Sequence, residues 1–466
     1  MRVTGESRSI ELQSTSAVVT DAAPEAARGA QPVRIVICGG GAAGVVLAST
    51  LARQNRRGQK FAVSLVDPDA SHVWKPLLHE FAAGSSETSL HKMDYIALAR
   101  RHGFFFSQGS LKEIDRESKM VLLGEAHDET GVEIAPDGRR LPYDYLVVAV
   151  GGVTDDFGIS GVQEHAWMLD SAADAQRIHR RILQYCMRAN YTPDIQPRSH
   201  MDINIVGGGA TGVELAAEMR DTTRELLSYG LNNIVPEDFI RLRIINADSR
   251  LLQQLPERIG NSVEAILRDL MVDVRNGEMV TEVAEDHVTT KSGVRFPSDL
   301  TIWAAGVKAP AWLSKIEGLE TNKANQLVVT STLQTTHDPA IFAIGDCASA
   351  PWIGTDKTVP PRAQAAFQQA RYLARAIPAH LRGERVKPFQ YSDFGSLISL
   401  GEDNAVGTLM GWVRGAGIRI EGFLAQSIYS WLYKRHQAAL YGWWGVLLDS
   451  LGRWMRGATR PRVKLH

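Results

Sequence analysis

The sequence of 466 residues predicts an α/β fold in which two units with parallel sheets share one chain, one inserted in the other. Two observations predict it. A glycine-rich turn follows a short apolar run twice, and each run indicates a strand that leads into a helix. A later apolar strand, Ala340–Asp346, then returns the chain to the first unit. The two turns are Gly39-Gly40-Gly41-Ala42-Ala43-Gly44 and Gly207-Gly208-Gly209-Ala210-Thr211-Gly212.

The spacing of these glycines has a physical reason. The first allows a tight turn, the second lets the backbone approach a pyrophosphate, and the third lets the helix pack on the strand. The pyrophosphate then binds the free N–H groups at the helix N-terminus. Two such turns predict two Rossmann-like domains that bind two dinucleotides, and therefore electron transfer between two cofactors.

Composition and charge narrow the class of protein. A hydrophobic fraction of 44% and a charged fraction of 22% are those of a globular protein, and a net charge of −1 predicts no nucleic-acid partner. Only three cysteines occur, Cys38, Cys186 and Cys347, without a CxxC pair. We therefore expect no metal site, no local redox disulfide and a reducing compartment.

We divide the chain into five parts. Residues 1–31 are expected to be a disordered tail without a signal peptide, since they lack an apolar stretch. No run of 18 apolar residues occurs, so no spanning helix is expected. The other parts are the first unit over 32–160, the inserted unit over 161–335, the second part of the first unit over 336–390, and a tryptophan-rich C-terminal region over 391–466.

Each unit is predicted to contain a second and a late strand. In the first unit these are Phe61–Asp67 and Tyr143–Gly152, and in the second Leu242–Asn246 and Leu300–Gly306. Asp67 ends its strand where an acid commonly binds a ribose hydroxyl, although an aspartate before a proline also suits a turn.

Several longer segments make the chain resemble the bacterial type II NADH dehydrogenases, single-subunit NADH:quinone oxidoreductases that carry FAD. The resemblance implies respiratory electron transfer without proton pumping, in which NADH reduces FAD and two electrons then pass to a membrane quinone. It covers essentially everything after the N-terminal tail. The segments are His72-Val73-Trp74-Lys75-Pro76-Leu77-Leu78-His79-Glu80, Gly207–Glu218, Trp303–Lys308, Ile344–Ser349, Pro360–Gln368 and Arg460–His466.

The resemblance assigns the first glycine turn to FAD. It implies that Asp67 binds the adenosine ribose, that Asp346 binds the ribityl chain and that Lys75 lies near the flavin ring. Asp346 could instead cap a helix beginning near Ala348, and Lys75 could extend to solvent from an apolar loop. The implied FAD residues are Gly39, Gly40, Gly41, Ala42, Ala43, Gly44, Asp67, Lys75, Leu111, Gly151 and Asp346.

The second turn is assigned in the same way to NADH. Glu214 is expected in the first turn of its helix, where nicotinamide meets flavin, although stabilisation of the helix dipole is the alternative. Relatives usually have an acid at the position of Asn246, and an amide cannot repel the 2′-phosphate of NADPH. Asp248, two residues further on, could take the role of that acid, although Arg250 is also close, and we favour NADH. The implied NADH residues are Gly207, Gly209, Gly212, Glu214, Asn246 and Gly306.

Gln364 and Gln368 carry the AQxxxQ pattern of the family, which implies a quinone site. Their spacing of four places both amides on one helix face, among alanines that favour close packing over a solvated face. Two amides on a largely apolar helix suit the carbonyl groups of a quinone.

The C-terminal stretch 443–456 is predicted to be an amphipathic helix. Tryptophan and basic residues on a short helix are typical of an interfacial anchor, whereas packing on the protein's own core is the alternative. Because the acceptor dissolves in lipid, we expect peripheral association with the cytoplasmic face of the inner membrane. The oligomeric state stays open, a homodimer included. The predicted apolar face is Trp444, Leu447, Leu448, Leu451 and Met455.

Two other functions are considered. A sulfide:quinone oxidoreductase shares the fold and the acceptor but needs paired redox cysteines, so Cys186 and Cys347 would have to meet. A flavin-bearing NAD(H)-sensing protein of the apoptosis-inducing-factor type would show little turnover, and the glutamine pair argues against it.

Overall fold

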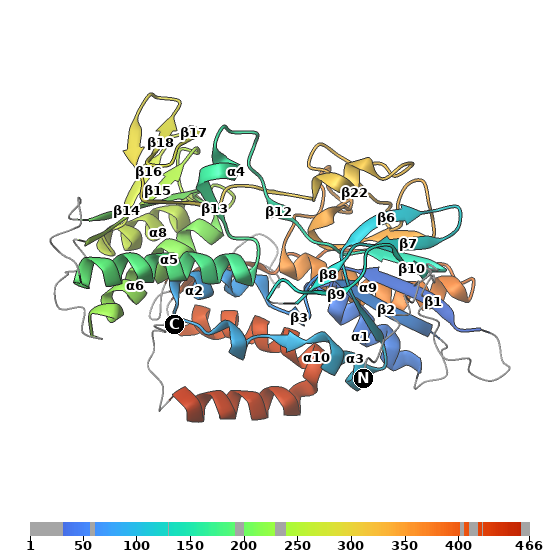
Figure 1. Ribbon diagram of the computed structural model, residues 1–466. Helices are drawn as coiled ribbons and strands as arrows, with labels where there is room; N and C mark the ends of the chain where they lie inside the picture. Colours follow the sequence, from blue (N-terminus) through green and yellow to red (C-terminus); the bar gives the residue numbers. More distant parts are fainter. Residues whose placement is uncertain are drawn as a thin grey trace, which may run out of the picture.

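Both predicted parallel sheets are present in the computed structural model (Figure 1). The structure describes residues 31–55, 61–128, 130–191, 200–228, 239–400, 405–409, 418–421 and 423–457. The predicted tail, except for residue 31, and the segment Arg460–His466 lie outside the described residues.

The first sheet has the order β23-β11-β1-β2-β5, and all its neighbouring strands are parallel. α1 (Gly44–Gln54) packs against β2, α3 (Tyr95–His102) and α9 (Ala363–Leu381). β23 comes from far along the chain, so the polypeptide re-enters this sheet after the second unit. The strands are β1 (Val33–Cys38), β2 (Phe61–Asp67), β5 (Phe105–Gln108), β11 (Tyr145–Val148) and β23 (Ile341–Ala343).

The second sheet has the order β13-β20-β14-β15-β16 and is also parallel. α2 (Leu78–Ala83) of the first unit packs on both α5 and α6 of the second, so the units meet there. The strands are β13 (Ala166–Met168), β14 (Met201–Val206), β15 (Ile240–Asn246), β16 (Asp273–Asn276) and β20 (Leu300–Trp303), and the helices are α5 (Ala172–Tyr191), α6 (Ala210–Ser228) and α8 (Glu257–Asp269). The predicted fold class, two Rossmann-like units with one inserted in the other, is confirmed.

The two passages of the chain between the units lie side by side. β12 (Val153–Thr154) pairs antiparallel with β21 (Val307–Lys308). Lys308 Nζ lies 2.9 Å from Asp155 and 2.7 Å from Asp156, and these ion pairs fasten the crossing.

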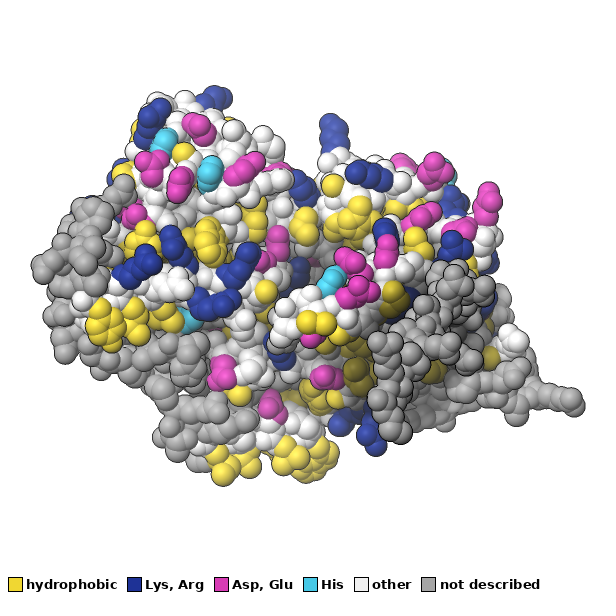
Figure 2. Space-filling model, in the orientation of Figure 1, with side chains coloured by type: hydrophobic (Ala, Val, Ile, Leu, Met, Phe, Trp, Pro, Cys, Tyr) yellow, Lys and Arg dark blue, Asp and Glu magenta, His cyan; other side chains and the backbone are white. Residues whose placement is uncertain are grey.

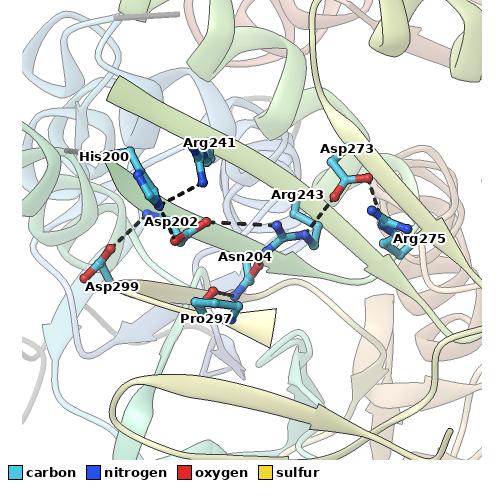
Figure 3. A network of polar contacts seen from close by, with 9 residues as sticks. All are labelled: His200, Asp202, Asn204, Arg241, Arg243, Asp273, Arg275, Pro297 and Asp299. Carbon is cyan, nitrogen blue, oxygen red and sulfur yellow. Dashed lines mark hydrogen bonds and ion pairs between the residues drawn. The ribbon is translucent and has the colours of Figure 1, made fainter. Parts of the chain in front are cut away.

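Polar side chains lie within the buried strands of the second sheet (Figure 3). Arg243 of β15 donates to Asn204 of β14 at 2.9 Å and to Asp273 of β16 at 2.9 Å. Asn204 in turn donates to Pro297 O at 2.9 Å, and the Asp202 backbone N–H donates to Asp299 at 2.9 Å. These contacts satisfy the polar groups that interrupt otherwise apolar strands.

Short elements complete the two units. They are β3 (Ser71–His72), β4 (Met93–Asp94), β6 (Leu111–Asp115), β7 (Met120–Leu123), β8 (Ala126–His127), β9 (Glu133–Ala135), β10 (Arg139–Pro142), α4 (Val162–His165), β17 (Val280–Val283), β18 (His287–Thr290), β19 (Arg295–Pro297), β22 (Leu327–Val328) and β24 (Ala348–Ser349).

The C-terminal region has its own arrangement. β25 (Gly395–Ser399), β26 (Ala405–Leu409) and β27 (Ile418–Glu421) form an antiparallel sheet that contacts α10 (Phe423–Gly457). Gly442 has φ +76°, which breaks α10 into two arms just before the predicted amphipathic helix. Figure 1 shows the second arm folded back beneath the first. No helix among the described residues is both long and apolar enough to cross a bilayer.

Candidate active site

The two glycine turns have the same backbone arrangement. Gly39 N donates to Val66 O at 2.7 Å, and Gly207 N donates to Ile245 O at 2.9 Å, so each turn bonds to the neighbouring strand. Their φ angles of +107° and +122° lie in the left-handed region, which favours glycine.

The last glycine of each turn lies directly against the first. A Cβ atom on Gly44 would lie 1.8 Å from Gly39 O, and one on Gly212 would lie 2.1 Å from Gly207 O. In contrast, a Cβ on Gly41 or Gly209 would meet no atom within 4 Å. Each turn therefore packs tightly on one side and presents an open backbone on the other, which fits an approaching pyrophosphate.

Asp67 organises the first turn. Its carboxylate accepts the Gly40 N–H at 2.5 Å and the Asp69 N–H at 2.9 Å, while burial raises the pKa of Asp67 to about 6. Tyr95, which sequence reasoning missed, donates its hydroxyl to Gly40 O at 2.8 Å. The predicted ribose ligand therefore also holds the glycine turn, so the ribose and turn interpretations are compatible.

The other predicted FAD residues surround this turn. Lys75 Nζ donates to Gly152 O at 3.3 Å, next to Gly151 with its φ of +75°. Burial raises the pKa of Asp346, and the charge of Lys75 partly offsets this. Leu111 is buried at the start of β6.

The alternative helix after Asp346 does not form. Gly345–Cys347 is a 3₁₀ turn, and Ala348 begins the short strand β24. Gln369 of α9, also missed from the sequence, accepts the Gly345 N–H at 2.7 Å and fixes this turn. Asp346 is thus presented by a loop and not by a helix N-terminus.

Asn246 lies beside the second turn, where Asp67 lies beside the first. Its Nδ2 donates to Asp248 O at 3.1 Å, Arg250 O at 3.0 Å and Asn276 Oδ1 at 2.9 Å. The amide therefore holds its own loop, and its oxygen is oriented toward Gly208. This explains why an amide can stand where relatives have an acid.

The guanidinium group of Arg250 is bound to its own loop. It donates to four backbone carbonyls, among them Gln253 O at 2.7 Å and Leu255 O at 2.8 Å. A side chain committed in this way offers little to a 2′-phosphate.

Glu214 lies deeper in its helix than predicted. α6 begins at Ala210, so Glu214 is past the first turn, and the expectation of a first-turn position was wrong. Its Oε1 accepts the Ser399 N–H at 3.0 Å, and its Oε2 lies 3.7 Å from His79 Nδ1. Burial, with Glu80 and Glu218 nearby, raises the pKa of Glu214 to about 8. Glu214 therefore holds a proton at neutral pH.

Two neighbours of Glu214 also titrate abnormally. Burial raises the pKa of Glu80 to about 8, with Glu218 adding to it, and lowers the pKa of His79 to about 4. Sequence reasoning assigned neither a role, although both end the segment that carried the family resemblance. Their grouping depends on α2 packing against α6, which no local pattern reveals.

Gln364 and Gln368 lie on α9 as predicted, but their amides bind the segment that follows Tyr391. Gln364 Nε2 donates to Asp393 Oδ1 at 3.2 Å and Gly395 O at 3.0 Å. Gln368 Nε2 donates to Ser392 O at 2.8 Å and its oxygen accepts the Ser392 N–H at 3.0 Å. Among the described residues, Gln364 has acceptors for both of its donors, whereas Gln368 has an acceptor for one of two.

Gly306 lies at the crossing between the units. Its φ is +72°, and a Cβ there would lie 2.5 Å from Phe157 Cζ and 2.9 Å from Asp155 Cβ. Glycine is therefore required by close packing beside the predicted NADH site.

The cysteines do not form a redox pair. Cys38, Cys186 and Cys347 are all described, buried and free, and burial raises the pKa of both Cys186 and Cys347 to about 12. Neither thiol is activated as a sulfide oxidoreductase would require.

Comparisons with known proteins show the family of the chain. Residues 33–370 match the family model described as pyridine nucleotide-disulphide oxidoreductase. The chain is 38% identical to the type II NADH:quinone oxidoreductase of Haemophilus influenzae over 93% of this chain and 99% of that relative. It is 28% identical to the Staphylococcus aureus enzyme of the same name, over 81% and 90%.

A solved structure shows the same fold. NDH2 of Plasmodium falciparum, in complex with NADH, matches with a TM-score of 0.77 at 20% identity, covering 93% of this chain and all of that one. The sequence match to the bacterial enzymes and the paired glycine turns lead to one conclusion: this chain belongs to the type II NADH:quinone oxidoreductases, within the pyridine nucleotide-disulphide oxidoreductase family.

Proposed function

We propose that this chain is a non-proton-pumping NADH:quinone oxidoreductase that uses FAD. Family membership supports this, and the carrying observation is the pair of open glycine turns, at Gly41 and Gly209, on one chain. FAD supplies the redox chemistry by accepting a hydride from NADH and passing two electrons to quinone. We assign residues 32–160 and 336–390 to FAD and residues 161–335 to NADH.

The residues around the turns have distinct tasks. Asp67 orders the first turn and offers its remaining lone pairs to the ribose, while Lys75 supplies positive charge at Gly152. Glu214 holds a proton where the units meet, and the Ser399 N–H fixes the orientation of its carboxyl group. A proton stored there is available when quinone is reduced to quinol.

For the quinone we propose the α9 face that carries Gln368 and Gln364. The free N–H of Gln368 donates to a quinone carbonyl, and Gln364 positions the segment 393–395. This division of roles follows from the donors that each amide has already used.

We further propose peripheral membrane association through the second arm of α10. Its apolar side chains point outward: Trp444 is 79% exposed and Leu448 is 68% exposed. Figure 2 shows hydrophobic side chains at the lower edge of the molecule, where Figure 1 places this arm. Such a face favours the membrane over packing on the protein's own core. The cytoplasmic face is the side on which NADH is available.

One preparation tests the proposal. Protein purified from membranes should show a flavin spectrum, NADH should bleach it without oxygen, and a short-chain quinone should restore it repeatedly. Bleaching without quinone turnover would favour the NAD(H)-sensing alternative. Light scattering on the same sample tests for a homodimer.

A further inference from the structure

Two arginines lie near one phenylalanine where α9 meets the first arm of α10. The guanidinium carbon of Arg371 is 6.0 Å from the centroid of the Phe367 ring, and that of Arg435 is 5.1 Å from it. Arg435 also lies 5.6 Å from the centroid of Trp431, which is 47% exposed. The two guanidinium groups thus contact the same ring, and the charge of Arg371 acts on Arg435.

Neither arginine forms an ion pair with a carboxylate in the part of the chain that the structure describes, whereas Arg34 pairs with Asp144 and Arg362 with Asp393. Burial, and then the charge of Arg371, lower the pKa of Arg435. Cation–π contacts offset only part of such repulsion. An anion between the two guanidinium groups would remove it.

The surroundings indicate which anion. Guanidinium groups bind phosphate through paired, charge-assisted hydrogen bonds. Exposed tryptophans, such as Trp431 on the first arm and Trp443 on the second, typically lie at the level of lipid headgroups. Arg371 is three positions after Gln368 on α9, so a headgroup there would hold the bilayer one helical turn from the quinone site.

We propose that Arg371 and Arg435 form a binding site for the phosphate of anionic phospholipid headgroups. The inference rests on the proposed membrane association and adds a specific contact to it. The site anchors the first arm of α10 and orients the quinone helix toward lipid, separately from the apolar face of the second arm.

The test compares binding of the holoenzyme to vesicles of phosphatidylcholine alone and of phosphatidylcholine with phosphatidylglycerol. Arg371→Gln and Arg435→Gln should each weaken binding to the anionic vesicles roughly 5-fold, and the double variant roughly 30-fold. Binding to neutral vesicles should not change. Flavin content and melting temperature report whether each variant is folded.

Arg375→Gln is the matched control, because Arg375 is exposed one turn further along α9 and makes neither ring contact. It should weaken binding to anionic vesicles less than 2-fold. If Arg375→Gln weakened binding to anionic vesicles as much as the other two variants, the effect would come from net positive charge alone. That result would overturn the proposed site.

Other outcomes separate the sources of the anion. Release of the wild type by millimolar inorganic phosphate, at constant ionic strength, would assign the pair to free phosphate instead. A raised KM for short-chain quinone in detergent, with unchanged vesicle binding, would assign it to quinone. Wild-type protein that binds no vesicles contradicts the membrane proposal itself, whereas unchanged charge selectivity in the double variant contradicts only this site.

Discussion

His72 and His436 lie 364 positions apart in the sequence, yet their Nε2 atoms are 2.9 Å apart in the folded chain. His72 Nδ1 lies 3.0 Å from Gly40 O, so it carries the proton, and His72 Nε2 accepts from His436. The ring of His436 also packs on Trp74, with centroids 4.2 Å apart. The first glycine turn is therefore fastened directly to the C-terminal helix, but only while His72 Nε2 is unprotonated and can accept.

This pair should make the protein sensitive to acid. Burial lowers the pKa of His72 to about 4, and burial with His72 nearby lowers that of His436 well below its usual value. The folded state then binds fewer protons than the unfolded state between about pH 6.5 and pH 4, so stability falls as pH drops through that range. We expect His436→Phe, which keeps a ring against Trp74, to reduce the fall in melting temperature between pH 7.5 and 5.

His337→Gln serves as the control, since His337 is exposed. It should melt with the wild-type pH dependence. If His436→Phe shows the same pH dependence as well, the histidine pair does not set acid stability.

Glu214 should confer a pH dependence on flavin reduction by NADH. Because the pKa of Glu214 is raised to about 8, it is protonated at pH 7 and loses its proton above pH 8. Glu214→Gln resembles the protonated form, so its rate at pH 7 should stay within a few-fold of wild type. The wild-type rate should fall above pH 8, whereas the variant rate should stay flat.

Stopped-flow measurements from pH 6.5 to 9.5 test this, with Glu164→Gln as an exposed control. A variant that retains the wild-type inflection near pH 8 would show that another group titrates.

The NADH site should respond to a carboxylate at position 246. Asn246→Asp adds repulsion of a 2′-phosphate, so the preference for NADH should sharpen. It also sets a carboxylate against three oxygen acceptors, and kcat/KM for NADH itself should fall roughly 5- to 10-fold.

Steady-state kinetics with both donors measure this, and Glu164→Gln, at an exposed position, is again the control. A wild-type preference for NADPH would contradict the donor assignment.

The sequence could predict the local features of the site but not the contacts between distant segments. The glycine turns, Asp67 and the strand before Asp346 follow from local rules, since turn geometry and strand periodicity depend on neighbouring residues. Partners such as Ser399 for Glu214, His436 for His72 and Ser392 for Gln368 join distant segments and follow only from packing. The alternative helix after Asp346 does not form, because Ala348 and Ser349 pair as β24 with β22, and this pairing too joins distant segments.

Loss of the second arm of α10 should weaken membrane binding without affecting FAD binding. Truncation after Gly442 should release the protein from membranes while flavin stays bound, because the predicted flavin contacts lie upstream. Salt alone should release it only partly, since apolar burial and charge both contribute. Trp444→Gln with Leu448→Gln is a milder variant that keeps the chain whole. Sedimentation of either variant with membranes at the wild-type level would place the anchor elsewhere.

Substitutions of Gln364 and Gln368 should have different effects on the quinone site. Gln368→Leu removes the one donor that is free for quinone, a hydrogen bond worth roughly 0.5–1.5 kcal/mol, so quinone affinity should fall roughly 2- to 13-fold. Gln364→Leu removes three hydrogen bonds to residues 393–395, and Gln368→Leu removes two to Ser392, so we expect both variants to lower stability. Only Gln368→Leu should weaken quinone affinity. Neither change should affect flavin reduction by NADH, and the exposed Gln176→Leu should affect neither half-reaction. Rapid mixing follows reduction and reoxidation separately. Slowed reduction with normal reoxidation in Gln368→Leu would mean that this face of α9 serves NADH and not quinone.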